Sequence, residues 1–196
     1  MTENERLLAL ISDKILQSER AYMLTHTNFL SLAERSAARA YCKEHGAHIH
    51  FYGGYPDAER TVLFVLPDYM EADEHFPSEE DEVLCVLSCR TSAGSKALTH
   101  RDYLGSLLSL GLEREVIGDI LVRENGADII VLKTIADYLL ANYEKAGHTP
   151  LKCEIKAIGA LVPPEVKTET IRESVASIRL DSIVSAVFGF SRTEAV

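Results

Sequence analysis

A six-residue pattern, T-x-x-D-Y-L, occurs twice in this chain, beginning at Thr99 and at Thr134. In each copy the threonine can cap a helix, because its side-chain oxygen can accept a hydrogen bond from a backbone N–H of the first turn. The aspartate three residues later can accept from the backbone N–H of the threonine, which completes a capping box. The pattern predicts two helices, the second running to about Ala146 with Gly147 just past its end.

Stretches of strand length surround both helices, at 83–87, 117–122, 128–132 and 151–157, and Asn125-Gly126 is a strong signal for a two-residue hairpin turn. The resulting order is β-α-β-β-α-β, which predicts a ferredoxin-like plait of RRM-like topology over residues 83–158. The first and third strands are almost wholly apolar, as central strands are. The last alternates, with Lys152, Glu154 and Lys156 on one face, which is typical of an edge strand.

The remaining segments complete an α+β prediction. Residues 1–70 are predicted to form a small α/β unit, with helices ending near Arg20 and beginning after Ser31, a break near 25–30, and strands at 49–52 and 61–66. An acidic linker follows at 71–82, and a second linker at 159–176. A helix after Ile178 is stopped by Gly189, and Ser191 is placed to cap a further helix.

Composition narrows the class of protein. The net charge of −10 argues against a broad basic surface. No apolar run has the length of a membrane span, and the N-terminus lacks the features of a signal peptide, so we expect a cytoplasmic protein with no membrane partner. In that compartment the four cysteines are expected to be core thiols.

No catalytic or cofactor signature is present. His100-Arg101-Asp102 resembles part of a kinase catalytic loop, but no glycine-rich loop or D-F-G segment accompanies it. Cys42, His45, His48 and His50 are close in sequence, but their spacing matches no strong zinc pattern. We therefore expect no enzyme activity, no metal and no small-molecule cofactor.

Several short stretches, taken together and in order, carry a family resemblance. They are 51–55 (F-Y-G-G-Y), 58–60 (A-E-R), 66–69 (L-P-D-Y), 100–105 (H-R-D-Y-L-G) with 110–111 (L-G), 117–120 (I-G-D-I), 179–182 (R-L-D-S) and 189–192 (G-F-S-R). This ordered set resembles the YlmH family of bacterial RNA-binding proteins. Residues 177–196 resemble the opening of an S-four RNA-binding domain, which would be truncated after Val196.

The resemblance implies a ribosome-associated protein that binds structured rRNA or tRNA on the large subunit, with a link to the rescue of stalled large subunits. It implies that Arg179, Ser191 and Arg192 belong to an RNA-contacting surface. His100 and Arg101, in the first turn of a predicted helix, suit an anion such as phosphate, although a plain solvated turn explains them equally well.

The plait itself offers a second possible RNA contact. Its central strands contain no Phe, Tyr or Trp, so the base stacking used by RRM domains is not expected. Any RNA contact would depend on charge and shape, through residues such as Arg90, Lys96, Arg101 and Lys133. Two alternatives remain open: a protein–protein adaptor linked to cell division, and a plait that senses a small molecule.

Overall fold

The computed structural model describes residues 2–70, 83–92, 94–163, 170–175, 177–189 and 191. The chain divides into two compact units, Met1–Pro163 and Pro164–Val196. The predicted acidic linker at 71–82 and Arg192 lie outside the described residues.

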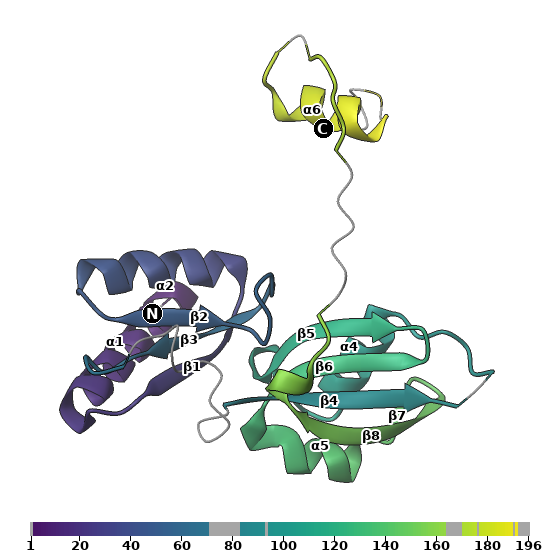
Figure 1. The fold of residues 1–196 in the computed structure, drawn as a ribbon, viewed down its shortest axis with the longest axis horizontal. Helices are drawn as coiled ribbons and strands as arrows, with labels where there is room; N and C mark the ends of the chain where they lie inside the picture. Colours follow the sequence, from purple (N-terminus) through teal and green to yellow (C-terminus); the bar gives the residue numbers. More distant parts are fainter. Residues whose placement is uncertain are drawn as a thin grey trace. The chain divides into compact units, whose positions relative to one another are not determined.

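The N-terminal part of the first unit pairs two helices with a small sheet. Its elements are α1 (Glu3–Ala21), β1 (Thr25–Leu30), α2 (Leu32–Glu44), β2 (Ile49–Tyr52) and β3 (Thr61–Val65). The antiparallel strand order is β1-β3-β2 (Figure 1). Both helices begin with capping boxes, at Thr2 and at the predicted Ser31. Ile11 of α1, Ala38 of α2 and Leu63 of β3 lie in their shared core.

The break expected near residues 25–30 is strand β1, so that expectation was wrong. Thr25 and Thr27 of this strand are buried, at positions where a hydropathy pattern would require apolar residues. Both hydroxyls are hydrogen-bonded inside the unit: Thr25 Oγ1 donates to Lys14 O at 2.9 Å, and Thr27 Oγ1 accepts from Leu63 N at 3.1 Å. Because hydrogen-bonded threonines take the buried positions, the strand shows no apolar alternation and a hydropathy pattern does not predict it.

The second part of the first unit is the plait, and its topology confirms the prediction. Its elements are β4 (Leu84–Thr91), α4 (His100–Ser109), β5 (Ile117–Arg123), β6 (Gly126–Leu132), α5 (Ala136–Asn142), β7 (Lys145–Ala146) and β8 (Thr149–Ala157), with 3-10 turns at Arg114–Val116, Lys133–Ile135 and Ile158–Ala160. The sheet order is β5-β6-β4-β8-β7, with β4 and β6 central as expected. All its pairings are antiparallel.

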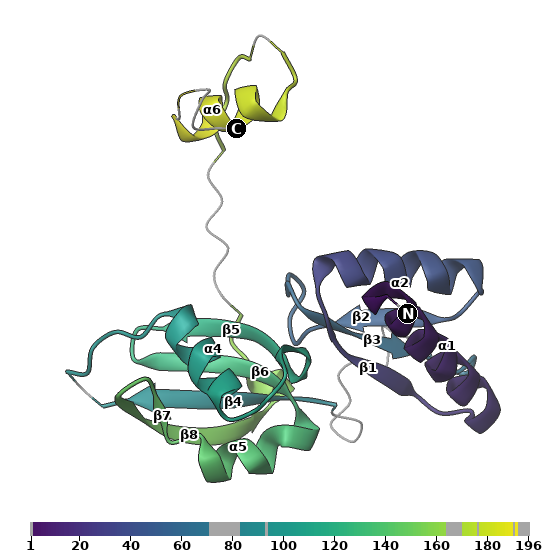
Figure 2. The same ribbon diagram turned by 180° about the vertical axis from the view of Figure 1, so that it is seen from behind.

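Helices α4 and α5 cover one face of this sheet (Figure 2). Leu87 of β4 and Ile129 of β6 are fully buried there against Tyr103 and Leu107 of α4 and Leu139 of α5. The opposite face of the sheet is free of these two helices, and the candidate site lies there.

The two T-x-x-D-Y-L copies behave differently. Thr99 forms the predicted capping box: its hydroxyl accepts from Asp102 N, and Asp102 Oδ2 accepts from Thr99 N at 2.8 Å. Thr134 does not cap α5, because the chain already turns at Lys133 and Thr134 lies inside a 3-10 turn. Helix α5 begins after Ile135 without a side-chain cap, so the second prediction was wrong.

Two boundaries also differ from the prediction. Helix α5 ends at Asn142, not near Ala146, since Ala146 is fully buried in β7 and pairs with Thr149 across a turn at Gly147. The hairpin between β5 and β6 turns through Glu124-Asn125, because Arg123 already pairs with Gly126. A Cβ at Gly126 would lie 2.0 Å from Cys89 O, so close backbone packing requires glycine there.

In the second unit, helix α6 (Leu180–Phe188) begins after Arg179 and ends at Gly189, whose φ of +67° is the left-handed conformation that glycine adopts readily. This confirms the helix predicted between Ile178 and Gly189. Across the described residues, no helix combines the length and apolarity needed to cross a membrane.

Candidate nucleic-acid interface

The sheet face opposite α4 and α5 is divided into an apolar part and a charged part. Alternate residues of β4 lie on this face, and along the strand they change from Leu84 and Val86 to Ser88 and Arg90. The neighbouring strand β6 changes in the same way, from Leu132 and Ile130 at one end to Asp128 nearer the other. The two parts have different partners.

The apolar part is covered by the N-terminal part of the same unit. Val86 and Ile130 share one buried cluster with Phe29 of β1 and Val62 and Phe64 of β3. The fit is close at β5, where a Cβ on Gly118 would lie 2.7 Å from the Phe29 ring. This half of the sheet is therefore closed to a ligand.

A buried carboxylate holds the same contact together. Asp119 of β5 accepts hydrogen bonds from the Tyr55 hydroxyl at 2.8 Å, from Glu59 N at 2.8 Å and from Arg60 N at 3.0 Å. Arg60 Nε donates to Ile117 O at 3.2 Å. Burial, and then the hydrogen bond to Asp119, raise the pKa of Tyr55 far above its usual value. The stretches 53–60 and 117–119, which carried much of the family resemblance, thus meet in one structural contact.

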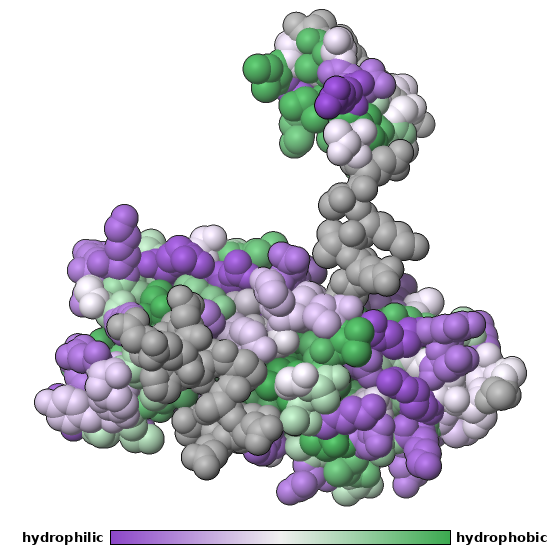
Figure 3. All heavy atoms as spheres, in the orientation of Figure 1, coloured by the Kyte–Doolittle hydropathy of each residue, from purple (hydrophilic) through white to green (hydrophobic). Residues whose placement is uncertain are grey.

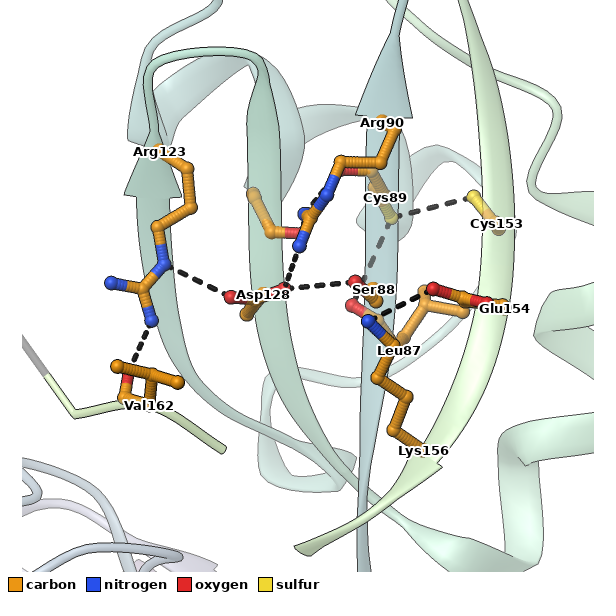
Figure 4. Close-up of polar contacts among 11 residues, drawn as sticks. Leu87, Ser88, Cys89, Arg90, Arg123, Asp128, Cys153, Glu154, Lys156 and Val162 are labelled. Atoms are coloured by element: carbon orange, nitrogen blue, oxygen red, sulfur yellow. Dashed lines mark hydrogen bonds and ion pairs between the residues drawn. The ribbon is translucent and has the colours of Figure 1, made fainter. Parts of the chain in front are cut away.

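The charged part centres on Asp128 of β6 (Figure 4). Its two carboxylate oxygens accept from different arginines: Arg90 Nη2 at 3.0 Å and Arg123 Nε at 2.9 Å. Ser88 Oγ also donates to it, at 2.9 Å. Burial raises the pKa of Asp128, but these three donors outweigh burial and lower the pKa overall. One carboxylate therefore fixes two guanidinium groups side by side across three strands.

Strand β8 adds a row of charges beside this cluster. The register pairs Arg90 with Lys152 and Ser88 with Glu154, and the alternation of the strand puts Lys156 on the same face. Lys156 Nζ lies 2.9 Å from Glu154 Oε1. The charged face, defined as Ser88, Arg90, Arg123, Asp128, Lys152, Glu154 and Lys156, therefore carries four cations and two carboxylates. Hydrophilic side chains gather over the plait strands in Figure 3.

Of the residues predicted for RNA contact on the plait, Arg90 lies on the charged face. The others lie elsewhere. Lys133 follows β6 at the end of the strand away from Gly126 and Arg90. Lys96 is exposed in the loop before α4, and Arg101 is exposed in the first turn of that helix.

His100, in the same turn, lines a cleft of about 580 Å³ in the first unit. Arg60 and Arg114 also line this cleft, but so do three carboxylates, those of Asp57, Glu59 and Asp119. Burial, with the nearby Arg60 guanidinium, lowers the pKa of Arg114 to about 10. This mixture of charges does not favour an anion at His100.

The second unit carries the other predicted residues. Arg179 precedes α6, its side chain is 72% exposed, and its Nε lies 3.0 Å from Asp181 Oδ1. Ser191 is exposed after the helix.

Arg123, Lys152 and Lys156 were not among the predicted contacts. The sequence signal was available in the alternation of 151–157 and in the hairpin signal at Asn125-Gly126. The register of β8 against β4 could not be read from the sequence, and that register places Lys152 beside Arg90.

The residues that the structure describes contain no group of three or more His, Cys, Asp or Glu side chains that could hold a metal. Cys89 and Cys153 are paired across β4 and β8 on the helix-covered face, with their Sγ atoms 3.3 Å apart. Both are free thiols.

Known proteins match this chain in three comparisons. Residues 77–159 match a family model described as the "putative RNA-binding domain in YlmH". "Ribosome-associated protein quality control protein P2" of Bacillus subtilis (strain 168) is 30% identical over 179 residues, which cover 91% of this chain and 67% of that protein. The structure of "Cell division protein ylmH from Streptococcus pneumoniae" is similar with a TM-score of 0.64 at 23% identity, covering 83% of this chain and 96% of that one.

The fold and the charged face define an α+β protein that carries a ferredoxin-like plait with one half of its open sheet face covered and the other half charged. Sequence identity and coverage then place it in a known group: the chain belongs to the YlmH family.

Proposed function

We propose that this protein is a non-catalytic RNA-binding protein that associates with the ribosome. One observation carries the proposal: the match to the RNA-binding domain model spans the plait, and one face of the plait carries four cations against two carboxylates on a chain whose net charge is −10. Concentrating cations on one face is what phosphate binding requires, since each contact releases counterions from the RNA. The name of the Bacillus subtilis relative supports the ribosome as the site of action.

The finer proposal is that the protein binds structured rRNA or tRNA on the large subunit and takes part in the rescue of stalled subunits. Arg179, Ser191 and Arg192 would form a second RNA contact, as the family resemblance of 179–192 implies. The exposed guanidinium of Arg179 supports this assignment.

Sedimentation through a density gradient tests the proposal. The protein should travel with large ribosomal subunits at low salt and return to the top of the gradient as salt rises, because phosphate contacts are salt-dependent. Nuclease treatment should release it. Co-sedimentation that withstands both salt and nuclease would support a protein–protein adaptor, and absence from the ribosomal fractions would contradict the proposal.

A further inference from the structure

The charged face combines three features that restrict the kind of RNA it can bind. Its arginines are fixed by neighbours, it contains no aromatic side chain, and the adjoining part of the sheet is covered. Together these features deepen the proposed function, on which the inference rests.

The arginines of the charged face are held in place before any ligand arrives. Arg90 and Arg123 share the carboxylate of Asp128, and Arg90 Nη1 also donates to Cys89 O at 2.9 Å. Arg123 is further held by its bond to Val162 O (Figure 4). Their side chains remain 42% and 28% exposed, so both guanidinium groups can still contact a ligand. Fixed cations match a partner whose phosphates are also fixed.

Base stacking has no platform on this sheet. The strands β4, β5, β6 and β8 contain no Phe, Tyr or Trp. In single-strand recognition, each stacked base contributes about 1–3 kcal/mol of binding free energy. Without that contribution, an unpaired strand would have to be ordered by phosphate contacts alone.

The N-terminal part of the unit closes the rest of the sheet. Phe29 and Phe64 are buried at 0% and 2% exposure in one cluster with Val86 and Ile130, so they cannot be offered to a base. The two half-buried tyrosines that pack against this cluster donate their hydroxyls within the unit, Tyr52 to Gly54 O and Tyr55 to Asp119. The surface left over is a patch of charged side chains, in which Lys152 is exposed and the Lys156 side chain is 38% exposed.

We propose that the charged face binds base-paired RNA through its phosphates and sugar hydroxyls, and does not bind unpaired bases. In a paired helix the bases are already stacked and the backbone geometry is fixed, so recognition needs cations and hydroxyl-bonding groups at set positions. Arg90, Arg123, Lys152 and Lys156 supply those groups. Ser88 is fully buried and acts only by donating to Asp128. The carboxylates of Asp128 and Glu154 orient the cations and disfavour close insertion of a base edge.

The test uses the whole chain with two RNAs of equal phosphate number, a fully paired hairpin of arbitrary sequence and polyuridylate. Binding is measured for the natural protein, for the double variant Lys152→Glu with Lys156→Glu, and for a charge-matched control, Arg6→Glu with Lys43→Glu, on exposed positions of α1 and α2. Unfolding midpoints check that all three proteins are folded. Lys152 is exposed and the Lys156 side chain is 38% exposed, so both variants should fold.

The natural protein should bind the hairpin at least about tenfold more tightly than polyuridylate, and the β8 variant should lose about tenfold or more of that affinity while the control loses less than about threefold. Equal or tighter binding of polyuridylate would overturn this inference and leave the proposed RNA binding intact. An equal loss in the control would overturn the assignment to this face. Failure of the natural protein to bind either RNA would overturn the proposed function as well.

Discussion

Asp119 connects the loop that follows β2 to strand β5, and its neighbours explain why it is buried. Three donors converge on the carboxylate, and two of them are the backbone N–H groups of Glu59 and Arg60. Removing a buried acceptor leaves its donors without a partner, which costs more than the net value of the hydrogen bonds.

We predict that Asp119→Ala lowers the free energy of unfolding by about 2–3 kcal/mol. Asp13→Ala, on the exposed side of α1, should change it by less than about 0.5 kcal/mol. Urea denaturation of both variants measures the difference. Similar stabilities would show that the contact between the two parts of the unit does not depend on this carboxylate.

Asp128 gives a pH-dependent prediction. Its folded-state pKa is lowered, so the unfolded chain binds more protons than the folded one between the two pKa values. The stabilisation is therefore complete above the unfolded pKa of about 4 and is lost as the pH falls through the lower folded value.

We expect Asp128→Asn to be less stable than the natural protein by about 2 kcal/mol at pH 7, because two arginines lose their charged acceptor. The gap should narrow steadily below about pH 4, as the natural carboxylate is itself protonated. Denaturant midpoints measured from pH 7 downward check this. A gap that stays constant over that range would contradict the role given to the carboxylate.

At the scale of elements, the two T-x-x-D-Y-L copies form a matched pair. One threonine caps α4 and the other lies in a 3-10 turn, although the local sequences are alike. We predict that Thr99→Ala destabilises the protein by about 1 kcal/mol, the usual value of a threonine cap. Thr134→Ala should change stability by less than about 0.5 kcal/mol. Thermal unfolding of the two variants gives the comparison, and equal losses would show that Thr134 stabilises the α5 start in another way.

This pair also shows which helix caps can be predicted from local sequence patterns. Capping signals predicted Ser31 and Thr99 correctly, because those caps need only nearby backbone. Thr134 failed because β6 runs directly into a turn at Lys133, a consequence of the pairing of Leu132 with Leu84. The topology of the plait was predictable from the spacing of its apolar runs.

The charged face was not predictable in the same way, because its residues come from four strands. Arg90 and Lys152 are neighbours only through the register of β4 with β8. The covering of the sheet by Phe29 depends on a strand, β1, that the hydropathy pattern did not reveal. Contacts of this kind require tertiary pairing, which a single sequence read by local rules does not specify.

At the scale of the whole molecule, the chain leaves the first unit beside the charged face. Arg123 donates to Val162 O, one residue before the unit ends at Pro163. The second unit begins at Pro164, so the chain itself joins it to the first unit. RNA contacts carried by two units of one chain raise each other's effective concentration.

The last prediction follows from that connection. If Arg179 and the charged face contact one RNA, Arg179→Ala should weaken binding of a tRNA transcript by about tenfold and reduce the slope of log affinity against log salt by about 0.7–0.9, the value of one phosphate contact. Asp181→Asn is the matched control, because it removes the carboxylate that pairs with Arg179 and leaves the guanidinium for phosphate. It should bind as tightly as the natural protein or more tightly. An unchanged affinity and salt slope in Arg179→Ala would remove the second unit from the RNA contact and leave binding to the sheet alone.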